Sequence, residues 1–345
     1  MKAVVFEKHG GIEVLQYRDV PVPQISPNDV LLRVKATALN HNDIWGREGV
    51  PGMEFIFPHI SGTDAAGVVE AVGSEVTNVR VGDGVVVNGA FSCRTCPECL
   101  RGDLVFCPEF KVWGFETGPL DGGQAEYARV PAANLVSKPE QLTWDEAASI
   151  PTVLVTAWRM LVTRAKIQPG DFVLVWGASG GLGCMAIQIC KVFGARAIAV
   201  ANSDEKLSLA RELGAKFVIN RKRQRVIREI SRITNRRGVD IVFEHVGAAT
   251  WETSIYALRW GGTIVICGAT TGFKTTVDLR FLWNKQQNYL GSHAGSTSEL
   301  FDAMQFVHNG VIKPVIMETL PLRDVSKAHE ILQKGDIMGK IVLVP

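Results

Sequence analysis

The segment Gly177-Ala178-Ser179-Gly180-Gly181-Leu182-Gly183 decides the fold of this chain because of what stands on either side of it. The continuous apolar run 172–176 precedes it, which is typical of a parallel strand buried on both faces. A stretch with helical character, 182–193, follows it. A glycine-rich turn between a strand and a helix is the context that dinucleotide binding requires. The segment therefore predicts a cofactor-binding βα unit.

Two glycines of this turn have a physical reason. Gly180 lets the backbone approach a pyrophosphate closely, and Gly183 lets the helix pack against its strand. Free N–H groups at the start of the helix attract phosphates. We therefore expect a cofactor to contact the run 179–183, that is Ser179, Gly180, Gly181, Leu182 and Gly183. The alternative is a tight turn with a purely structural role.

The sequence on either side of this unit shows two different patterns of secondary structure. Apolar runs at 197–200, 217–219, 241–243 and 263–266 continue the alternation with helices, one of which covers 206–213 and is closed by Gly214. This pattern predicts an α/β fold with a doubly wound parallel sheet. The first 150 residues instead contain β-branched runs at 30–36, 66–72 and 84–87 between turn residues, and they predict a β-rich domain. The tail contains a helix near 298–308 and a final strand, 340–344.

Composition narrows the function classes. The 345 residues suggest two domains, and 46% hydrophobic with 21% charged residues indicate a globular chain. A net charge of +2 argues against a general affinity for nucleic acid or anionic membranes. No apolar run approaches the roughly 18 residues of a membrane span, and the start has no signal-peptide pattern. We therefore expect a cytoplasmic protein, in which the seven cysteines do not form a disulfide framework.

The end of the second strand bears on which dinucleotide is bound. An NAD enzyme usually carries an acidic residue there, about 20 residues past the glycines. This chain has Asn202 and Ser203 instead. Ser203 and Lys206 could bind a 2′-phosphate, and Arg221, after the third strand, could reach the same place. The sequence therefore favours NADP(H) over NAD, and the alternative is that Lys206 and Arg221 are solvated surface charges.

Four cysteines lie close together in the sequence, at Cys93, Cys96, Cys99 and Cys107. Four thiolates at this spacing suit a closed, tetrahedral zinc site of the structural kind. The surrounding segment has little apolar core, so a metal could supply its folding energy. An iron–sulfur cluster or four incidental thiols are the alternatives. The sequence predicts one structural zinc ion per chain.

These motifs together resemble the medium-chain dehydrogenase/reductase superfamily of zinc alcohol dehydrogenases and quinone oxidoreductases. The segment 58–69 is similar to the family's G-H-E-x-x-G motif, 121–127 to its G-x-x-A-E-Y turn, and 147–158 to the entry into its cofactor domain. The resemblance implies a GroES-like catalytic domain over 1–150 with a zinc lobe at about 90–110, a Rossmann domain over 151–290, and a return to the first domain over 291–345. It also implies a homo-oligomer, either a dimer or a tetramer.

The chain departs from the family where zinc alcohol dehydrogenases hold their catalytic zinc. The positions of the two cysteine ligands and the histidine ligand are Asn40, Thr152 and Thr63. Asn42 stands at the usual Ser or Thr of the proton relay, and Trp45 at a relay histidine of some relatives. Neutral Asn and Thr are poor zinc ligands compared with thiolate and imidazole. We therefore expect no catalytic zinc beside the retained structural one.

The pattern then resembles the quinone-oxidoreductase branch, in Asn40-x-x-Asp43 and in the turn 202–206. Hydride transfer without a Lewis acid favours conjugated acceptors, so we expect a carbonyl, enone or quinone substrate. Carried over by position, Asn40, Trp45, Thr63 and Thr152 line the substrate cleft. The alternative for Asn40 and Thr63 is that they merely fill the space of the metal. Further expected cofactor contacts are His41, Thr156, Asn202, His245 and Val246.

Other functions compete with this one. One is a zinc-dependent alcohol dehydrogenase with unusual ligands. Another is an NADPH-binding sensor or a nucleic-acid-binding module, suggested by eight basic residues and one acidic residue over 221–237. No aromatic residue interrupts that run, as single-strand binding would require, so a solvated helix face is favoured. We therefore expect a small-molecule substrate, with neither nucleic acid nor a membrane as partner.

Overall fold

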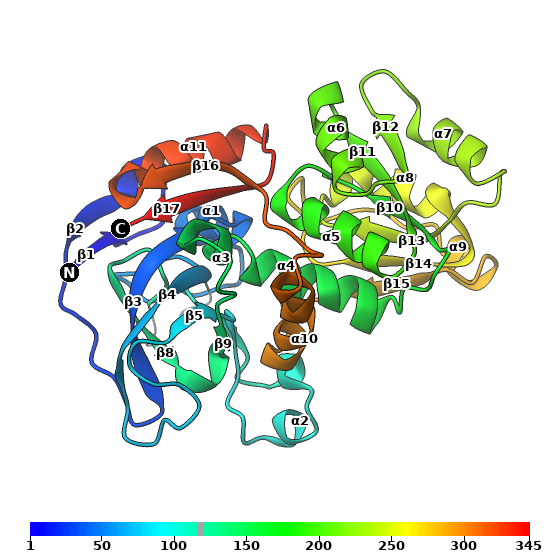
Figure 1. Ribbon diagram of the computed structural model, residues 1–345. Coiled ribbons are helices and arrows are strands. Elements are labelled where there is room, and N and C mark those ends of the chain that lie inside the picture. Colours follow the sequence, from blue (N-terminus) through cyan, green and yellow to red (C-terminus); the bar gives the residue numbers. More distant parts are fainter. Residues whose placement is uncertain (116–120) are drawn as a thin grey trace. The chain divides into compact units, whose positions relative to one another are not determined.

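The computed structural model divides this chain into two compact units and describes residues 1–115 and 121–345. Unit 1 consists of Met1–Thr152 and Ala294–Pro345, and unit 2 consists of Val153–His293. Figure 1 shows the ends of the chain together in unit 1. Helix α4 (Pro151–Trp158), which continues into a π-helical turn at Arg159–Arg164, carries the chain into unit 2. Unit 1 is thus assembled from both ends of the sequence, and unit 2 from its middle.

Unit 2 contains a six-stranded sheet in which every neighbouring pair of strands is parallel. The strand order is β12-β11-β10-β13-β14-β15, which confirms the predicted doubly wound sheet. Its strands are β10 (Phe172–Val175), β11 (Arg196–Ala201), β12 (Phe217–Asn220), β13 (Val239–Glu244), β14 (Leu258–Ile266) and β15 (Asn288–Gly291). The first five of these strands contain the predicted apolar runs, whereas β15, a short edge strand, lies outside them.

The helices of unit 2 connect and cover these strands (Figure 1). They are α5 (Gly181–Val192), α6 (Asp204–Glu212), α7 (Val226–Ile233), α8 (Ala248–Ala257) and the short α9 (Arg280–Trp283). The two predicted helices, 182–193 and 206–213, correspond to α5 and α6. One large apolar cluster contains Leu174, Ile198, Val242 and Ile264 from four adjacent strands. Burial of these runs on the sheet faces explains why their sequence is continuously apolar.

Unit 1 is built on a largely antiparallel sheet of order β16-β17-β3-β4-β5-β9, with β8 paired to β3. Its strands are β3 (Asp29–Ala38), β4 (Asp64–Val72), β5 (Gly84–Val87), β8 (Tyr127–Pro131), β9 (Leu135–Ser137), β16 (Ile316–Pro321) and β17 (Lys340–Val344). Two smaller pairs are β1 (Lys2–Val5) with β2 (Gln16–Asp19), and β6 (Ala90–Phe91) with β7 (Lys111–Val112). The predicted strands 30–36, 66–72, 84–87 and 340–344 are confirmed.

Two of the helices of unit 1 come from the C-terminal segment. The helices of this unit are α1 (His41–Glu48), α2 (Pro97–Leu100), α3 (Trp144–Ala148), α10 (Thr297–His308) and α11 (Val325–Lys334). The core is split into several small apolar clusters, one of which joins Val4 and Leu39 to Val325 and Leu343. Within residues 1–115 and 121–345, no helix has both the length and the apolar character to cross a membrane.

One strand register in unit 1 positions the site described next. Ala38, at the end of β3, pairs with Asp64 of β4 on one side and with Val342 of β17 on the other. The beginnings of β4 and β17 therefore lie beside the end of β3. This places Asp64 close to Lys340, although the two residues are 276 positions apart.

Candidate functional site

The four lobe cysteines converge in unit 1. Their sulfur atoms all lie within 4.8 Å of one another. Cys93 Sγ is 3.5 Å from Cys107 Sγ and 3.9 Å from Cys99 Sγ. The backbone N–H of Cys96 donates to Cys93 Sγ at 3.3 Å, and N–H donation of this kind stabilises thiolates. Donation from the backbone of Thr95 and Cys96 lowers the pKa of Cys93 to about 6.

This cluster fits a structural zinc ion. Tetrahedral zinc with Zn–S bonds of about 2.3 Å requires sulfur–sulfur distances of about 3.8 Å, close to the separations found here. Cys99 and Cys107 are buried, and Cys93 and Cys96 are half-buried. Four thiolates and no open position leave no place for a substrate. A metal at this cluster would hold the lobe together rather than take part in a reaction.

A second polar cluster, centred on Asp64, occupies the positions where the resemblance places catalytic zinc ligands. Asp64 is fully buried, and both carboxylate oxygens are engaged. Oδ1 accepts from the backbone N–H of Thr152 at 2.8 Å. Oδ2 accepts from Asn40 Nδ2 at 2.8 Å and from the Lys340 ammonium at 3.0 Å. Lys340 also donates to Asn40 Oδ1 at 2.6 Å, which closes a triangle of three buried or half-buried side chains.

Asn40 is positioned by the start of helix α1. Asn40 is the N-cap of α1, and its backbone N–H donates to Asp43 Oδ2 at 2.7 Å. Gln124 Nε2 donates to the other oxygen of Asp43 at 3.1 Å. Asp43 is buried, and this burial raises the pKa of its carboxyl to about 7. Two carboxyl groups thus lie beside one ammonium in the interior of unit 1.

Two hydroxyl groups near Asp64 have no hydrogen-bond partner among the described residues. They are Thr63 Oγ1 and Thr152 Oγ1, and both atoms are buried. An unpaired buried hydroxyl costs roughly 1–3 kcal/mol, so such groups usually mark a place for a bound oxygen atom or an ordered water. The Asn40 amide differs from them, because its oxygen and its nitrogen both already form hydrogen bonds. His41 and Trp45 lie in α1, with their rings edge to face at 4.9 Å.

The donor set of this cluster does not fit a catalytic zinc ion. Within the described residues, the cluster offers no thiolate or imidazole, and the Asp64 carboxylate is bound on both oxygens. A metal would have to displace Lys340 or stand close to its positive charge. The cluster offers instead the unpaired hydroxyls of Thr63 and Thr152 and the buried ammonium of Lys340.

The glycine turn lies in unit 2 between β10 and α5, as predicted. Gly180 is the N-cap of α5, in extended rather than left-handed backbone. A Cβ on Gly183 would come within 2.4 Å of the Gly177 carbonyl oxygen, so helix and turn pack too closely for any side chain there. A Cβ on Gly180 would meet only that same oxygen, at 3.6 Å, and the space beside Gly180 is otherwise free. This cradle and the free N–H groups of α5 fit a pyrophosphate.

His245 and Val246 follow β13, next to the glycine turn. His245 Nε2 donates to the Trp176 carbonyl oxygen at 3.0 Å. A Cβ on Gly177 would come within 2.7 Å of the His245 ring, so this glycine gives the ring its place. Glu244, fully buried, accepts from the backbone N–H groups of Val246 and Gly247 at 2.7 and 3.1 Å. The turn after β13 is therefore fixed by its own neighbours.

The residues predicted to read a 2′-phosphate lie at the carboxyl ends of β11 and β12. Ala201 pairs with Asn220 at this edge, and the Arg221 N–H donates to the Ala201 carbonyl. Ser203 is the N-cap of α6 and accepts from the N–H of Lys206 at 3.4 Å. Arg221 is exposed, whereas Lys206 is buried.

The nearby acid Asp204 is already engaged. It accepts from Asn220 at 2.8 Å and from Arg223 at 2.6 Å, and these bonds, led by Asn220, lower the pKa of its carboxyl. An acid held in this way is less available for ribose hydroxyls. Asn202 lies half-buried just before it.

The predicted residues are divided between the units. Unit 1 holds Asn40, His41, Trp45, Thr63, Thr152 and the four lobe cysteines, and unit 2 holds the glycine turn, Thr156, the residues after β11 and β12, and His245 with Val246. Asp64, Gln124 and Lys340 belong to this site without having been predicted from the sequence. Asp64 stands in a quoted motif next to Thr63, a signal that could have been used. Lys340 opens the last strand and has no local signal.

Comparisons with known proteins cover both units. A family model for an alcohol dehydrogenase GroES-like domain matches residues 26–140, and a model for a zinc-binding dehydrogenase matches residues 181–309. The chain is 37% identical to a crotonyl-CoA carboxylase/reductase of Cereibacter sphaeroides over 95% of its own length and 83% of that protein.

Solved structures give the same picture. A structure titled as an NAD-dependent alcohol dehydrogenase has a TM-score of 0.96 and 42% identity, with both chains fully covered. A crotonyl-CoA carboxylase/reductase in complex with NADP has a TM-score of 0.92 and 31% identity, over 100% of this chain and 94% of that one. These likenesses extend over the full length of the chain.

Proposed function

Since this chain belongs to the medium-chain dehydrogenase/reductase superfamily, we propose that it is an NADP(H)-dependent oxidoreductase that works without a catalytic zinc ion. Its substrate class would be conjugated carbonyl compounds: enones, quinones and α,β-unsaturated thioesters. The observation that carries this proposal is the Asp64 cluster. Asp64 lies among the positions expected for the catalytic zinc ligands, and its carboxylate already accepts hydrogen bonds from Lys340 and Asn40. The similarity to crotonyl-CoA reductases supports a conjugated acceptor.

The choice of cofactor rests on the edge of the unit 2 sheet. Arg221 and Lys206 would bind the 2′-phosphate, and Asp204, the first acid after β11, is held by Asn220 and Arg223. The cradle beside Gly180 would hold the pyrophosphate on the first turn of α5. When bound, NADPH supplies the hydride. The turn that carries His245 and Val246 would line the adenosine side of the cofactor.

The residues of unit 1 would act on the substrate oxygen. Charge develops on this oxygen during hydride transfer to a conjugated carbonyl, and fixed donors stabilise it. Thr63 Oγ1 and Thr152 Oγ1 are the two unpaired hydroxyls available for that purpose. Lys340 contributes a buried positive charge nearby, and Asn40 holds Lys340 and Asp64 in place. Asn40 is therefore a positioning residue in this proposal.

A homo-oligomer is part of the proposal. Unit 2 exposes several large apolar side chains, among them Trp260, Phe273, Leu279 and Trp283, each more than 60% exposed. They belong to β14, α9 and the loop between them, and β14 is the neighbour of the edge strand β15. Exposed apolar side chains beside an unpaired strand edge favour association with another chain. Light scattering on the purified protein would give the number of subunits.

The proposed function is tested by metal content and turnover together. We expect one zinc ion per chain by elemental analysis, and reduction of a quinone, an enone and crotonyl-CoA with NADPH faster than with NADH. A simple ketone should react more slowly. Cys107→Ser should lose the zinc and destabilise the lobe, whereas Cys267→Ser in unit 2 should keep it. Two zinc ions per chain, or no turnover of any conjugated acceptor despite tight NADPH binding, would reject the proposal.

A second candidate is favoured by one comparison. The solved structure with 42% identity is titled an NAD-dependent alcohol dehydrogenase. On this reading the chain would oxidise alcohols with NAD, and the phosphate contacts proposed for Arg221 and Lys206 would not form. Initial rates with ethanol, butanol and benzyl alcohol, measured with NAD and with NADP, separate the two candidates.

A further inference from the structure

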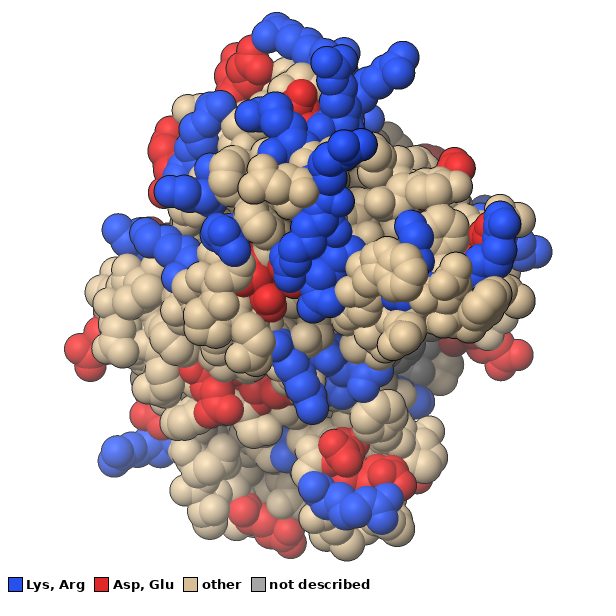
Figure 2. Space-filling model, turned by 90° about the vertical axis from the view of Figure 1, so that its right-hand side faces the viewer, with Lys and Arg blue, Asp and Glu red and all other residues tan. Residues whose placement is uncertain are grey.

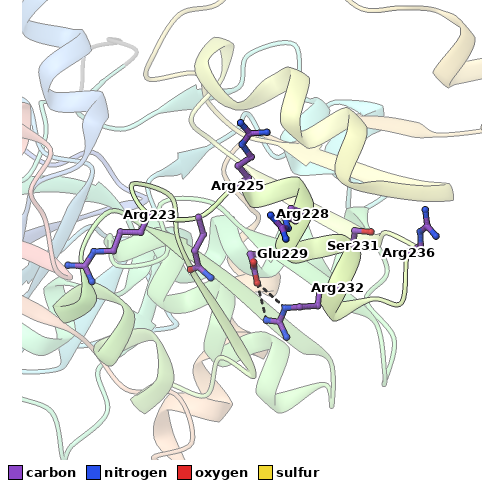
Figure 3. Close-up of a pocket in the computed structure, with 8 residues that line it drawn as sticks. Arg223, Arg225, Arg228, Glu229, Ser231, Arg232 and Arg236 are labelled. Carbon is purple, nitrogen blue, oxygen red and sulfur yellow. Dashed lines mark hydrogen bonds and ion pairs between the residues drawn. The ribbon is translucent and has the colours of Figure 1, made fainter.

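An arginine-rich groove runs along the surface of helix α7 in unit 2. The groove has a volume of about 600 Å³, and it is lined by Arg223, Gln224, Arg225, Arg228, Glu229, Ser231, Arg232 and Arg236. We call these residues the α7 groove. Figure 3 shows Arg228 and Arg232 on the helix, Arg223 and Arg225 before its start, and Arg236 beyond its end. Helix α7 comes directly after β12 in the chain, and β12 is an edge strand of the unit 2 sheet.

The segment 221–237, which contains the α7 groove, has a much higher net charge than the rest of the chain. Residues 221–237 contain seven arginines, one lysine and one glutamate, which gives +7 in a chain whose total is +2. The remaining residues therefore sum to −5. Figure 2 shows Lys and Arg side chains gathered in a band over the upper half of one face. Such segregation produces a local field that net charge does not reveal.

Much of this charge has no internal counterion. Glu229 pairs with Arg232 at 3.0 Å, and Asp204 pairs with Arg223 at 2.6 Å. Among the ion pairs of the described residues, none involves Arg225, Arg228 or Arg236, and all three are exposed. Arg228 and Arg232 are also like charges at i and i+4 on one helix, a spacing that destabilises a helix. An external anion would relieve this repulsion.

The length of the groove indicates an extended anion. From Arg225, the N-cap of α7, to Arg232 the backbone rises about 10 Å along the helix axis, at 1.5 Å per residue. Phosphates of one strand in duplex DNA are spaced by about 3.4 Å along the axis, so this row spans about three of them. The 2′-phosphate of a cofactor is a single group and would not reach along it. Arginine forks also suit phosphate oxygens, which they bind in pairs.

The lining residues favour a nucleic-acid backbone over a protein. No apolar or aromatic side chain lines the groove. Protein interfaces usually have an apolar centre, and single-stranded nucleic acid is usually stacked on aromatic rings. Contacts to a duplex backbone need neither. The near-neutral total charge and the missing aromatic residues, which led us to expect no nucleic-acid partner, therefore do not argue against a duplex.

We propose that the α7 groove binds the sugar–phosphate backbone of duplex nucleic acid without reading its bases. Backbone contacts of this kind give weak, salt-dependent binding, with Kd of about 10⁻⁴–10⁻⁶ M at physiological salt. This inference does not depend on the proposed function.

The test measures binding of a fluorescent 20-base-pair DNA duplex by anisotropy from about 50 to 200 mM KCl. The parent should show a linear fall of log K with log salt concentration, with a slope of about −0.9 per phosphate contacted. Arg225→Gln/Arg228→Gln/Arg236→Gln should reduce that slope by about 2.7 and weaken binding at least tenfold at the lowest salt. These three residues have no place in the proposed cofactor site, so NADPH binding should be unchanged.

A matched control removes the same charge elsewhere. Lys8, Arg80 and Arg323 are exposed residues of unit 1, and their triple replacement by Gln should leave duplex binding within twofold of the parent. Equal losses in the two triple variants would overturn the proposal, because binding would then depend on total charge alone. So would the absence of binding at about 50 mM KCl. Displacement of the duplex by poly-glutamate at equal charge concentration would assign the groove to acidic proteins instead.

Discussion

The two units bury a carboxylate in opposite ways. In unit 2, Glu244 is satisfied by residues within ten positions of it: the backbone of Val246 and Gly247 and the hydroxyls of Thr250 and Ser254. In unit 1, Asp64 is satisfied by residues 24, 88 and 276 positions away, namely Asn40, Thr152 and Lys340. The first arrangement is a local turn. The second exists only when distant parts of the chain have come together, which makes unit 1 more vulnerable to single changes.

Removal of the Lys340 ammonium should have the largest effect. Lys340→Met leaves the buried Asp64 carboxylate without its counterion, beside Asp43, and should lower the free energy of unfolding by about 3–5 kcal/mol. The matched change in unit 2, Thr250→Val, removes one hydroxyl bond to Glu244 and should cost about 1.5–3 kcal/mol. Urea unfolding followed by fluorescence measures both. The double variant Asp64→Asn/Lys340→Met should recover part of this loss of stability. If Lys340→Met destabilises the protein no more than Thr250→Val does, the proposed difference between the two buried carboxylates is wrong.

Loss of the unpaired Thr63 hydroxyl should affect turnover rather than stability. Thr63→Val should lower kcat with a conjugated acceptor by about 10²–10³-fold, the usual cost of a lost transition-state donor. Thr63→Ser keeps the hydroxyl and should retain most of the activity. Asn40→Leu should behave differently, because it breaks the contacts to Asp64 and Lys340 and should lower the melting temperature as well. Parental turnover in Thr63→Val would make Thr63 a residue that only fills space.

A change at the sheet edge of unit 2 should be selective for the cofactor. Arg221→Ala should weaken NADPH binding about tenfold by removing a charge-assisted contact of roughly 1.5–3 kcal/mol, and it should hardly change NADH binding. Arg211→Ala, an exposed arginine on α6, serves as the control. Titrations followed by quenching of protein fluorescence give both affinities. If NADPH and NADH lose affinity equally, Arg221 does not read the 2′-phosphate.

The smallest expected effect is a pH dependence in unit 1. His329 in α11 is 1% exposed, and burial, together with the charge of Arg47, lowers the pKa of its ring to about 3. The unfolded chain takes up this proton near pH 6.5, so the stability that the neutral ring contributes is lost as pH falls through 6.5 towards 3. Between pH 8 and pH 6 this loss amounts to about 0.8 kcal/mol.

His329→Phe should therefore lose less stability than the parent between pH 8 and pH 6, as measured by urea unfolding at each pH. The exposed His308 provides the comparison, because His308→Phe makes the same substitution without replacing a buried ring. Identical pH dependence in the parent and in His329→Phe would show that other groups account for any loss.

Local patterns explain how far the sequence could predict this fold. The strands β10, β11 and β13 contain continuous apolar runs, and the glycine turn stands directly between a strand and a helix, so the fold of unit 2 could be predicted from neighbouring residues. Strand β15 was missed because its four residues include an exposed Asn288 and an exposed Gly291 and show no apolar run. Strand β16 was missed for a similar reason, since exposed and half-buried residues alternate along most of it.

The candidate site could be predicted only in part. The cysteine cluster is a local motif, and the structure brings all four thiols together. The positions Asn40, Thr63 and Thr152 came from a resemblance, and no local pattern reveals that Asn40 is tied to Lys340. That contact depends on the pairing of β17 with β3, which joins the two ends of the chain. Long-range pairing of this kind has no periodic signal in the sequence.

The insertion of unit 2 into unit 1 has a consequence for synthesis of the chain on the ribosome. The Asp64 carboxylate is made 276 residues before the lysine that neutralises it. At about 5–20 residues per second, it waits about 14–55 s for its counterion. Unit 2 emerges complete within that interval, whereas the early part of unit 1 lacks β17 on the edge of β3. During this interval the nascent first segment exposes unpaired backbone at the end of β3, which is open to pairing with a neighbouring polypeptide.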